Sequence, residues 1–403
     1  MISLKILKNF ILKFFNNTNY QLAIIDNLFP QAKPMGFRNT EINALLDIFQ
    51  DSKAYCMYVM KAGNKAWSWL CCGKSKKQFK KDFNGYLSYY PYNANKIKYL
   101  PPFLYKKLVY CYFLGETYTL LPYLNNNKLP FIFVLYPGGC FALNNKYSND
   151  MLREVFRSPY FQKVIVTQPI TKKYLLENNL CEKDKIYELM GGYLQFNKNE
   201  TENLKYLFYP NDKTTIDICF CAFKYIEKGI DKGYDLFIDV AKKLVPKYSH
   251  LHFHIIGNFD ESEIDITEIK DNLSFYGILQ SEHLKEVYPQ MDICLSPNRA
   301  FKLGDGCFDG FPGGGEAMAF NCTLLTSDEL NNNYGFMDNE DLIIIKPDID
   351  DICHKVEWLV NNMDKCYEIG KSGRNKIYDI ADPQERVTKV SNLIKDCLIK
   401  LNN

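Results

Sequence analysis

Short apolar runs rich in β-branched and aromatic residues recur along this chain, and most are followed by a turn and a helix-forming segment. Runs of this kind are typical of buried parallel strands, and their alternation with helices predicts an α/β fold. With 403 residues the chain is long enough for two domains, each with its own core. The clearest runs are residues 21–26, 131–136, 163–167, 216–223 and 251–256.

A segment rich in Asn, Lys, Glu and Thr, residues 197–215, interrupts this alternation and indicates a linker. We therefore expect two Rossmann-like domains. The N-terminal domain takes residues 1–200 and the C-terminal domain residues 216–380, with residues 201–215 assigned to the linker. Residues 381–403 are expected to form a C-terminal helix.

Composition argues against several classes of partner. The net charge is +2, which gives no strong field for nucleic acid. None of the 14 cysteines forms a C-x-x-C pair, and Cys71-Cys72 and Cys219-x-Cys221 are not zinc spacings. The longest apolar runs are far too short for a membrane span. We expect a cytoplasmic protein in a reducing compartment, either soluble or peripheral at the inner face of the cell membrane.

Two basic segments leave membrane contact open. Residues 1–18 predict an amphipathic helix, which suits either an anionic membrane surface or packing against the domain. Trp67 and Trp69 precede a lysine run at residues 74–81. Aromatic side chains beside lysines suit a membrane interface or an anionic lipid-linked acceptor, whereas most charge runs are solvated faces. The lysines of this run are Lys74, Lys76, Lys77, Lys80 and Lys81.

Residues 305–328 carry the strongest functional signal. Gly313, Gly314 and Gly315 stand directly before Glu316 and a helix-forming run, and an apolar strand signal follows. A helix entered through glycine exposes its first N–H groups, which suits a diphosphate. Glu316 and the upstream Asp309 suit hydrogen bonds from sugar hydroxyls, so the stretch predicts a sugar-nucleotide pocket. The alternative is that Glu316 favours the positive helix end and the glycines only turn the chain.

This stretch resembles the donor-binding signature of retaining GT-B glycosyltransferases of family four (glycosyl transferases group one). In that signature an acidic residue, a Gly-Phe-Pro-like turn and a Glu-Ala-Met-Ala helix start follow in this order. The family's first acid contacts the donor sugar and its second acid the ribose, with seven residues between them; here Asp309 and Glu316 have six between them. The resemblance spans most of residues 160–380. It implies a GT-B fold, in which the two domains face each other across a cleft that holds the active site and the final helix packs back on the first domain.

The resemblance also implies two cations. The family has an arginine at the end of the second domain's first strand and a lysine before a glycine soon after, and both neutralise the donor diphosphate. Lys224 fills the arginine position, and Lys232 fills the second, with Lys228 as a rival. Negative charge grows on the diphosphate as the glycosidic bond breaks, and preplaced cations stabilise that charge. Lys224, Lys232 and Glu316 are therefore the predicted catalytic residues.

On the acceptor side, we expect loops at the carboxyl ends of two strands of the first domain. Arg38 lies in the predicted loop 27–39 and is a candidate for phosphate or acceptor binding, while Gly138 and Gly139 follow the run 131–136. Many family members carry a histidine at that second place, but all five histidines here lie beyond residue 249. The resemblance implies chemistry in which the donor's own phosphate helps the acceptor hydroxyl lose its proton.

Other motifs point to no metal and no redox cofactor. His252 and His254 share a strand face without a third ligand nearby, so we interpret them as structural. Asp348-Ile349-Asp350 has the spelling of a metal-binding Asp-x-Asp but precedes a predicted helix, where Asp is a common N-cap. No G-x-G-x-x-G follows an early strand, as a nicotinamide dehydrogenase would require.

The sequence therefore predicts a metal-independent glycosyltransferase. It would move a sugar from a nucleoside-diphosphate sugar to a hydroxyl of a cell-envelope glycan or lipid-linked acceptor, and the resemblance implies retention of configuration. No cofactor is expected, because the sugar nucleotide is a substrate. The alternative is a catalytically degenerate GT-B protein that binds nucleotide or acts as a scaffold in glycan assembly.

Overall fold

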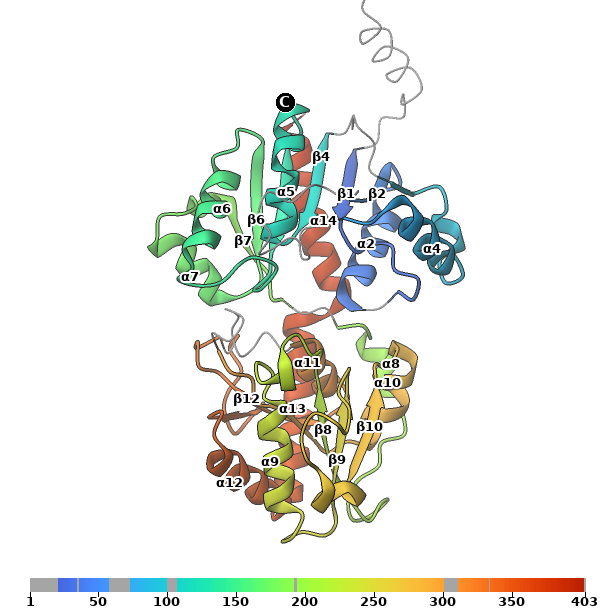
Figure 1. Cartoon of the computed structure of the whole chain (residues 1–403), viewed down its shortest axis with the longest axis vertical. Coiled ribbons are helices and arrows are strands. Elements are labelled where there is room, and N and C mark those ends of the chain that lie inside the picture. The colour runs from blue at the N-terminus through green and yellow to red at the C-terminus, as the bar shows by residue number, and fades with distance from the viewer. Residues whose placement is uncertain are drawn as a thin grey trace, which may run out of the picture.

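The computed structural model describes residues 21–34, 36–57, 73–99, 107–191, 194–300, 311–332 and 334–401. These residues form two separate sheets of parallel strands, each packed between helices (Figure 1). The prediction of two parallel α/β domains is confirmed.

The first domain contains a seven-stranded sheet. Helices α2, α4 and α14 supply buried side chains to the core on one face, and α5, α6 and α7 supply those on the other. In spatial order the strands are β3 (Ile97–Tyr99), β2 (Ser52–Cys56), β1 (Leu22–Asp26), β4 (Leu108–Tyr112), β5 (Phe131–Leu135), β6 (Phe161–Val166) and β7 (Ile186–Glu188). The helices are α2 (Gly36–Ile48), α4 (Lys76–Leu87), α5 (Leu114–Asn126), α6 (Lys146–Phe156), α7 (Pro169–Glu177) and α14 (Pro383–Lys400).

The second domain contains a six-stranded sheet. Its strands, in spatial order, are β10 (Leu273–Gly277), β9 (Leu251–Ile256), β8 (Ile216–Cys221), β11 (Ile293–Ser296), β12 (Thr323–Ser327) and β13 (Ile343–Ile345). Its helices are α9 (Tyr234–Leu244), α10 (Ser281–Val287), α11 (Phe311–Ala319), α12 (Ile349–Val360) and α13 (Met363–Ala381). A short helix, α8 (Lys198–Glu202), lies between the two sheets in sequence.

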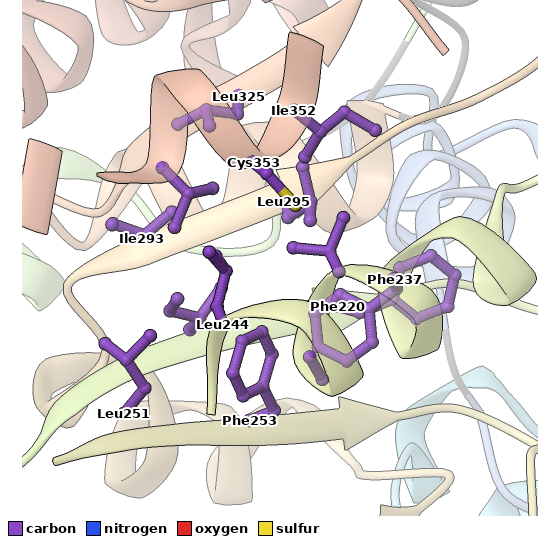
Figure 2. Close-up of a cluster of buried hydrophobic side chains, with 14 of the residues drawn as sticks. Phe220, Phe237, Leu244, Leu251, Phe253, Ile293, Leu295, Leu325, Ile352 and Cys353 are labelled. Carbon is purple, nitrogen blue, oxygen red and sulfur yellow. The ribbon is translucent and has the colours of Figure 1, made fainter. Parts of the chain in front are cut away.

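Both faces of each sheet are buried. In β1, Leu22 and Ile24 belong to one core, whereas Ala23 and Ile25 belong to the core on the opposite face. Figure 2 shows one core of the second domain, where side chains of the strands meet those of α9 and α12. A strand buried on both faces needs an uninterrupted apolar run, which explains why such runs predicted these strands.

Each sheet grows outward from its centre in two directions. In the first domain the order reverses between β1 and β4, and in the second between β8 and β11. In open α/β sheets, ligands bind outside the carboxyl ends of the strands at these switch points. The fold therefore points to two places for functional residues, one in each domain.

The two carboxyl edges face each other. Thr167, directly after β6, accepts a hydrogen bond of 2.9 Å at its carbonyl from the Tyr334 hydroxyl of the second domain. Asn332 Oδ1 accepts one of 3.0 Å from the backbone N–H of Ile170. The arrowhead of β1 in Figure 1 points toward the second domain in agreement with these contacts.

The C-terminal helix returns to the first domain. Asp382 caps α14 by accepting hydrogen bonds from Gln384 N and Glu385 N, and Pro383 starts the helix. Val390, Ile394 and Leu398, one turn apart, are buried in the same core as β1. The chain therefore crosses between the domains a second time, and the first domain's core is incomplete without this helix.

A buried ion pair fixes that return. The Arg386 guanidinium of α14 lies 3.2 Å from Glu41 Oε2 of α2, and both side chains are almost fully buried. Glu41 Oε1 accepts hydrogen bonds from the Tyr110 and Tyr112 hydroxyls at 2.9 and 3.0 Å. Arg386 also donates to the carbonyl of Met190, which precedes the crossing to the second domain. Every part of this pair is thus neutralised or hydrogen-bonded.

The structure corrects several predicted elements. Helix α2 begins at Gly36, so Arg38 lies in its first turn and not in the loop predicted for residues 27–39. The sequence also predicts a strand at residues 54–60, whereas among the described residues β2 covers Ser52–Cys56. Four lysines of the run, Lys76, Lys77, Lys80 and Lys81, belong to helix α4, whereas Lys74 precedes it. The predicted linker contains α8. Residues 1–18, Trp67 and Trp69 lie outside the described residues.

Among the described residues, no helix combines the length and the apolar character required to cross a bilayer.

Replacing Arg386 by Met should lower the free energy of unfolding by about 3–5 kcal/mol, because it leaves the Glu41 carboxylate buried without its cation. Urea denaturation measures this loss. Replacing Lys389 by Met is the control, since that lysine pairs with Glu385 on the exposed side of the same helix and should cost no more than about 1 kcal/mol. Equal effects of the two substitutions would contradict the assigned role of Arg386.

Candidate functional site

Lys224 lies at the carboxyl edge of the second sheet, three residues beyond the end of β8. Asn258, just after β9, fixes its backbone: Asn258 Oδ1 accepts from Lys224 N at 2.7 Å, and Asn258 Nδ2 donates to the Lys224 carbonyl at 3.3 Å. The Lys224 ammonium is 2.5 Å from Glu263 Oε1. The predicted diphosphate cation therefore stands at the switch point and already has an anionic partner.

Lys232 is held on a tight turn beside β11. Gly233 has a φ of +75°, and a Cβ there would lie 2.1 Å from the carbonyl oxygen of Pro297, so the turn requires glycine. Arg299 bonds both carboxylate oxygens of Asp235, at 2.7 and 2.8 Å, and thereby ties the turn to the loop after β11. The Lys232 ammonium lies 5.9 Å from the centre of the Tyr225 ring.

The rival Lys228 is exposed in a short 3₁₀ helix and has a φ of +54°. Both lysines thus belong to the connection between β8 and α9.

The triple-glycine segment lies inside helix α11, not in front of it. The helix begins at Phe311, two residues before Gly313. The helical residues whose N–H groups have no intrahelical partner are therefore Phe311 and Gly313, because Pro312 has no N–H and Gly314, the fourth residue, already donates within the helix. A Cβ at Gly314 would lie 3.1 Å from Leu324 Cδ1 of β12, so close helix–sheet packing explains this glycine. Asp309 lies outside the described residues.

Glu316 is the buried acid of the site, with a relative exposure of 2%. Its Oε1 accepts a hydrogen bond of 2.6 Å from the backbone N–H of Gln195, in the segment that crosses between the domains. Its Oε2 has no hydrogen-bond partner among the described residues. Burial raises the pKa of Glu316 to about 8, with the charge of Glu200 adding to the rise and the bonds to Gln195 opposing it.

Arg38 occupies the switch point of the first sheet. Its Nη1 lies 2.8 Å from Asp26 Oδ2 at the end of β1 and 3.3 Å from Glu116 Oε1 in α5. The guanidinium also stacks over the Phe113 ring, 4.4 Å from its centre. Burial alone would lower the pKa of Arg38, but the charges of Asp26 and Glu116 raise it above its usual value. Any phosphate approaching Arg38 would meet these two carboxylates.

Gly138 and Gly139 lie beside that cluster. Gly138 and Phe141 exchange backbone hydrogen bonds of 2.9 and 2.8 Å, which closes a turn just after β5. Gly139 has a φ of +50°, and a Cβ there would lie 2.3 Å from the Phe113 ring. The same ring thus contacts both Gly139 and Arg38, so the structure brings the predicted acceptor-side residues together.

Sequence reasoning missed the partners of these residues. Glu263 comes from an acidic segment after β9, and Arg299 from the loop after β11. Asp26 is the last residue of a predicted strand, and that position could have identified it as a candidate. Glu116 lies 78 residues from Arg38 in sequence, so no local pattern could have identified it. Side chains so far apart in the chain carry no local pattern.

The remaining motifs have structural partners. His254 Nε2 is 2.8 Å from Asp217 Oδ1, and His252 Nε2 is 2.8 Å from the Ser274 hydroxyl. Asp348 accepts from the N–H groups of Asp350 and Asp351 at the start of α12, which confirms the predicted N-cap. Within the ranges that the structure describes, no group of three or more His, Cys, Asp or Glu side chains could hold a metal ion.

Comparison with known proteins agrees with this geometry. Residues 227–376 match the family model described as Glycosyl transferases group 1. A search of the curated proteins gave no significant match. The matched region contains the turn at Lys232 and helix α11.

Solved structures share the architecture over nearly the whole chain. Sucrose-phosphate synthase (tll1590) from Thermosynechococcus elongatus is similar with a TM-score of 0.62 and 13% identity, covering 95% of this chain and 100% of that one. HepE (Alr3699) of Anabaena in complex with UDP and glucose gives a TM-score of 0.63 and 10% identity, over 94% and 100% of the two chains. A glycosyltransferase from Rickettsia africae gives 0.61 and 13%, over 94% and 99%. The chain therefore has the GT-B fold.

Replacing Glu316 by Gln should change how stability depends on pH. Between its ordinary pKa of 4.5 and its folded pKa of about 8, Glu316 keeps a proton when folded that it releases when unfolded, so its contribution to stability falls as pH rises. Glutamine does not titrate. The variant's melting temperature relative to the natural protein should therefore rise from pH 5 to pH 8.5.

Glu282, an exposed acid of α10, provides the control for this measurement. Replacing Glu282 by Gln should leave the relative melting temperature nearly independent of pH. The same flat profile for Glu316→Gln would contradict the raised pKa assigned to Glu316.

Proposed function

We propose that the chain is a glycosyltransferase that moves a sugar from a nucleoside-diphosphate sugar to a hydroxyl of a cell-envelope glycan or lipid-linked acceptor, with retention of configuration. One observation carries this proposal: buried Glu316 has one oxygen bonded by the crossing segment and the other without a partner among the described residues. A buried carboxyl oxygen without a hydrogen-bond partner is costly, and the hydroxyls of a ribose, which both donate and accept, are suitable partners. The Glycosyl transferases group 1 match and the GT-B fold support this assignment.

The leaving group is the nucleoside diphosphate. As the bond to the sugar breaks, negative charge grows on the diphosphate oxygens, and Lys224 and Lys232 stand at the switch point to stabilise it. The free N–H groups at the start of α11 add a positive helix end on the same edge. In this assignment Glu316 orients the nucleotide and the lysines lower the barrier. Asp309 is assigned to the donor sugar by resemblance alone.

The acceptor hydroxyl must lose a proton during transfer. The five histidines all lie beyond residue 249, so no histidine of the first domain is available as a base. We assign this step to a phosphate oxygen of the donor. The predicted Asp-x-Asp is used in capping α12, so we propose that transfer needs no metal.

The acceptor is assigned to the first domain. Arg38 and the turn of Gly138 and Gly139 meet at the Phe113 ring, at the carboxyl edge opposite the donor residues. Arg38 is braced by Asp26 and Glu116, so it acts in this proposal as a fixed hydrogen-bond donor and not as a free phosphate site.

A basic face on helix α4 suits a lipid-linked acceptor. Its exposed side includes Lys76, Lys77, Lys80 and Lys81, while Phe79 and Phe83 stack on the inner side with ring centres 5.6 Å apart. Exposed Tyr89 and Tyr92 follow the helix. Lysines with nearby tyrosines are typical of contact with an anionic membrane surface. We propose that this face brings the protein to the inner surface of the cell membrane, together with residues 1–18.

Replacing Lys232 or Glu316 by Ala should lower the transfer rate, by about 10²–10³-fold for the lysine because it removes a cation that acts on the transition state. A thermal-shift screen with UDP, GDP, ADP and CMP first selects the donor base. Release of the free nucleoside diphosphate from the matching sugar nucleotide then gives the rate, with excess chelator present.

Lys228→Ala is the matched control and should retain the activity. Unchanged rates in both Lys232→Ala and Glu316→Ala would contradict the assignment of the site. Nucleotide binding without release of diphosphate, across a panel of donors and acceptors, would instead favour the catalytically degenerate scaffold. Loss of activity with chelator would contradict metal independence.

Replacing Lys76, Lys77, Lys80 and Lys81 together by Gln should reduce binding to vesicles that contain phosphatidylglycerol by at least about 100-fold, since each lysine near an anionic surface adds about 1 kcal/mol. Co-sedimentation measures the bound fraction. A control variant removes the same charge from the second domain by replacing Lys243, Lys247, Lys270 and Lys365 by Gln, each more than half exposed. Similar losses in both variants would contradict a role for α4.

A further inference from the structure

The loop after β9 places an acid on a cation of the proposed donor site. Glu263 Oε1 lies 2.5 Å from the Lys224 ammonium, and their side chains are 12% and 26% exposed. The neighbouring acids of this loop turn elsewhere: Glu261 pairs with Lys270 at 2.9 Å, and Asp260 accepts from Ser262 within the loop. Glu263 is thus the loop acid bonded to Lys224.

This pairing conflicts with the role proposed for Lys224. A lysine ammonium is a compact point charge, without the guanidinium fork that holds two anions side by side. A diphosphate that approaches Lys224 would also be repelled by the Glu263 carboxylate, and partial burial strengthens that repulsion. Diphosphate and Glu263 therefore compete for one cation.

We infer that Glu263 sets the affinity of the donor site, an inference that rests on the proposed function. The Glu263 carboxylate pairs with Lys224 when the site is empty, and the diphosphate binds by displacing that carboxylate. In the absence of ligand, the ion pair with Glu263 keeps the Lys224 side chain ordered and its charge neutralised. Competition from Glu263 also lowers the affinity for the nucleoside-diphosphate product, which must leave after transfer.

Tyr234 provides a new partner for the displaced carboxylate. Its hydroxyl is fully buried and has no hydrogen-bond partner among the described residues. Its ring lies 4.5 Å from that of Phe259, and the Lys224 ammonium lies 6.0 Å from the same Phe259 ring. Burial raises the pKa of Tyr234, and the charges of Glu263 and Asp260 add to this rise. A hydrogen bond from the Tyr234 hydroxyl to the displaced carboxylate would lower the cost of the exchange.

The test compares Glu263→Gln with Glu261→Gln, which removes the same charge from the outward side of the loop. Calorimetric titration with UDP, GDP, ADP and inorganic pyrophosphate gives the dissociation constants. We expect Glu263→Gln to bind the preferred nucleotide and pyrophosphate about tenfold more tightly than the natural protein, and Glu261→Gln to bind them equally. Glu263→Asp, which keeps the charge but shortens its reach, should lie between.

Unchanged or weaker binding by Glu263→Gln would overturn the inference, because Glu263 would then support Lys224 and not compete with the ligand. Tyr234→Phe should weaken binding about threefold; if it does not, Tyr234 is not the second partner. Failure of the natural protein to bind any of the four probes would overturn the proposed function itself. The two failures are thereby distinguished.

Discussion

The buried pair of Arg386 and Glu41 is the interaction on which the arrangement of the two domains depends. Removing two charges from water costs several kcal/mol each, so the pair is tolerable only with full hydrogen bonding. The chain supplies it from distant segments, through the Tyr110 and Tyr112 hydroxyls and the Met190 carbonyl. Because Arg386 follows the second domain in the chain, the buried Glu41 of the first domain is neutralised by a residue from beyond the second domain.

That closure also reaches the proposed donor site. Met190 and Gln195 stand on the same crossing segment; the first accepts from Arg386 and the second donates to Glu316. The backbone that joins the domains is therefore bonded to the C-terminal helix at one point and to the buried acid of α11 at the next. A shift of the crossing segment would therefore alter the hydrogen bond of 2.6 Å that the Gln195 N–H donates to Glu316 Oε1. The position of the acid is thus linked to that of the backbone that joins the domains.

The sequence predicted most strands of the two sheets, because β1, β5, β6, β8 and β9 are buried on both faces and read as continuous apolar runs. It did not predict the short edge strand β3, the buried strand β4, or helix α4, in which few apolar residues stand among the lysines. It singled out Lys224, which follows a strand, and Arg38 and Glu316, which lie within helices. It did not locate their partners: Glu263 lies 39 residues from Lys224 and Gln195 121 residues from Glu316. Local pattern identifies a charged residue, but only the fold determines its neighbours.

Those neighbours change how the site should be understood. Prominent cations of both domains are already paired with acids. Lys224 pairs with Glu263, and Arg38 pairs with Asp26 and Glu116. The electrostatic attraction for a diphosphate is then smaller than the cations alone suggest, which agrees with a chain of net charge +2. Selectivity for the ligand must come from groups whose contacts improve only when it binds, such as Glu316 Oε2, which has no hydrogen-bond partner among the described residues. On this view the donor site recognises a sugar nucleotide by exchanging internal partners for ligand atoms, and the strength of binding is set by the difference between the two sets of contacts.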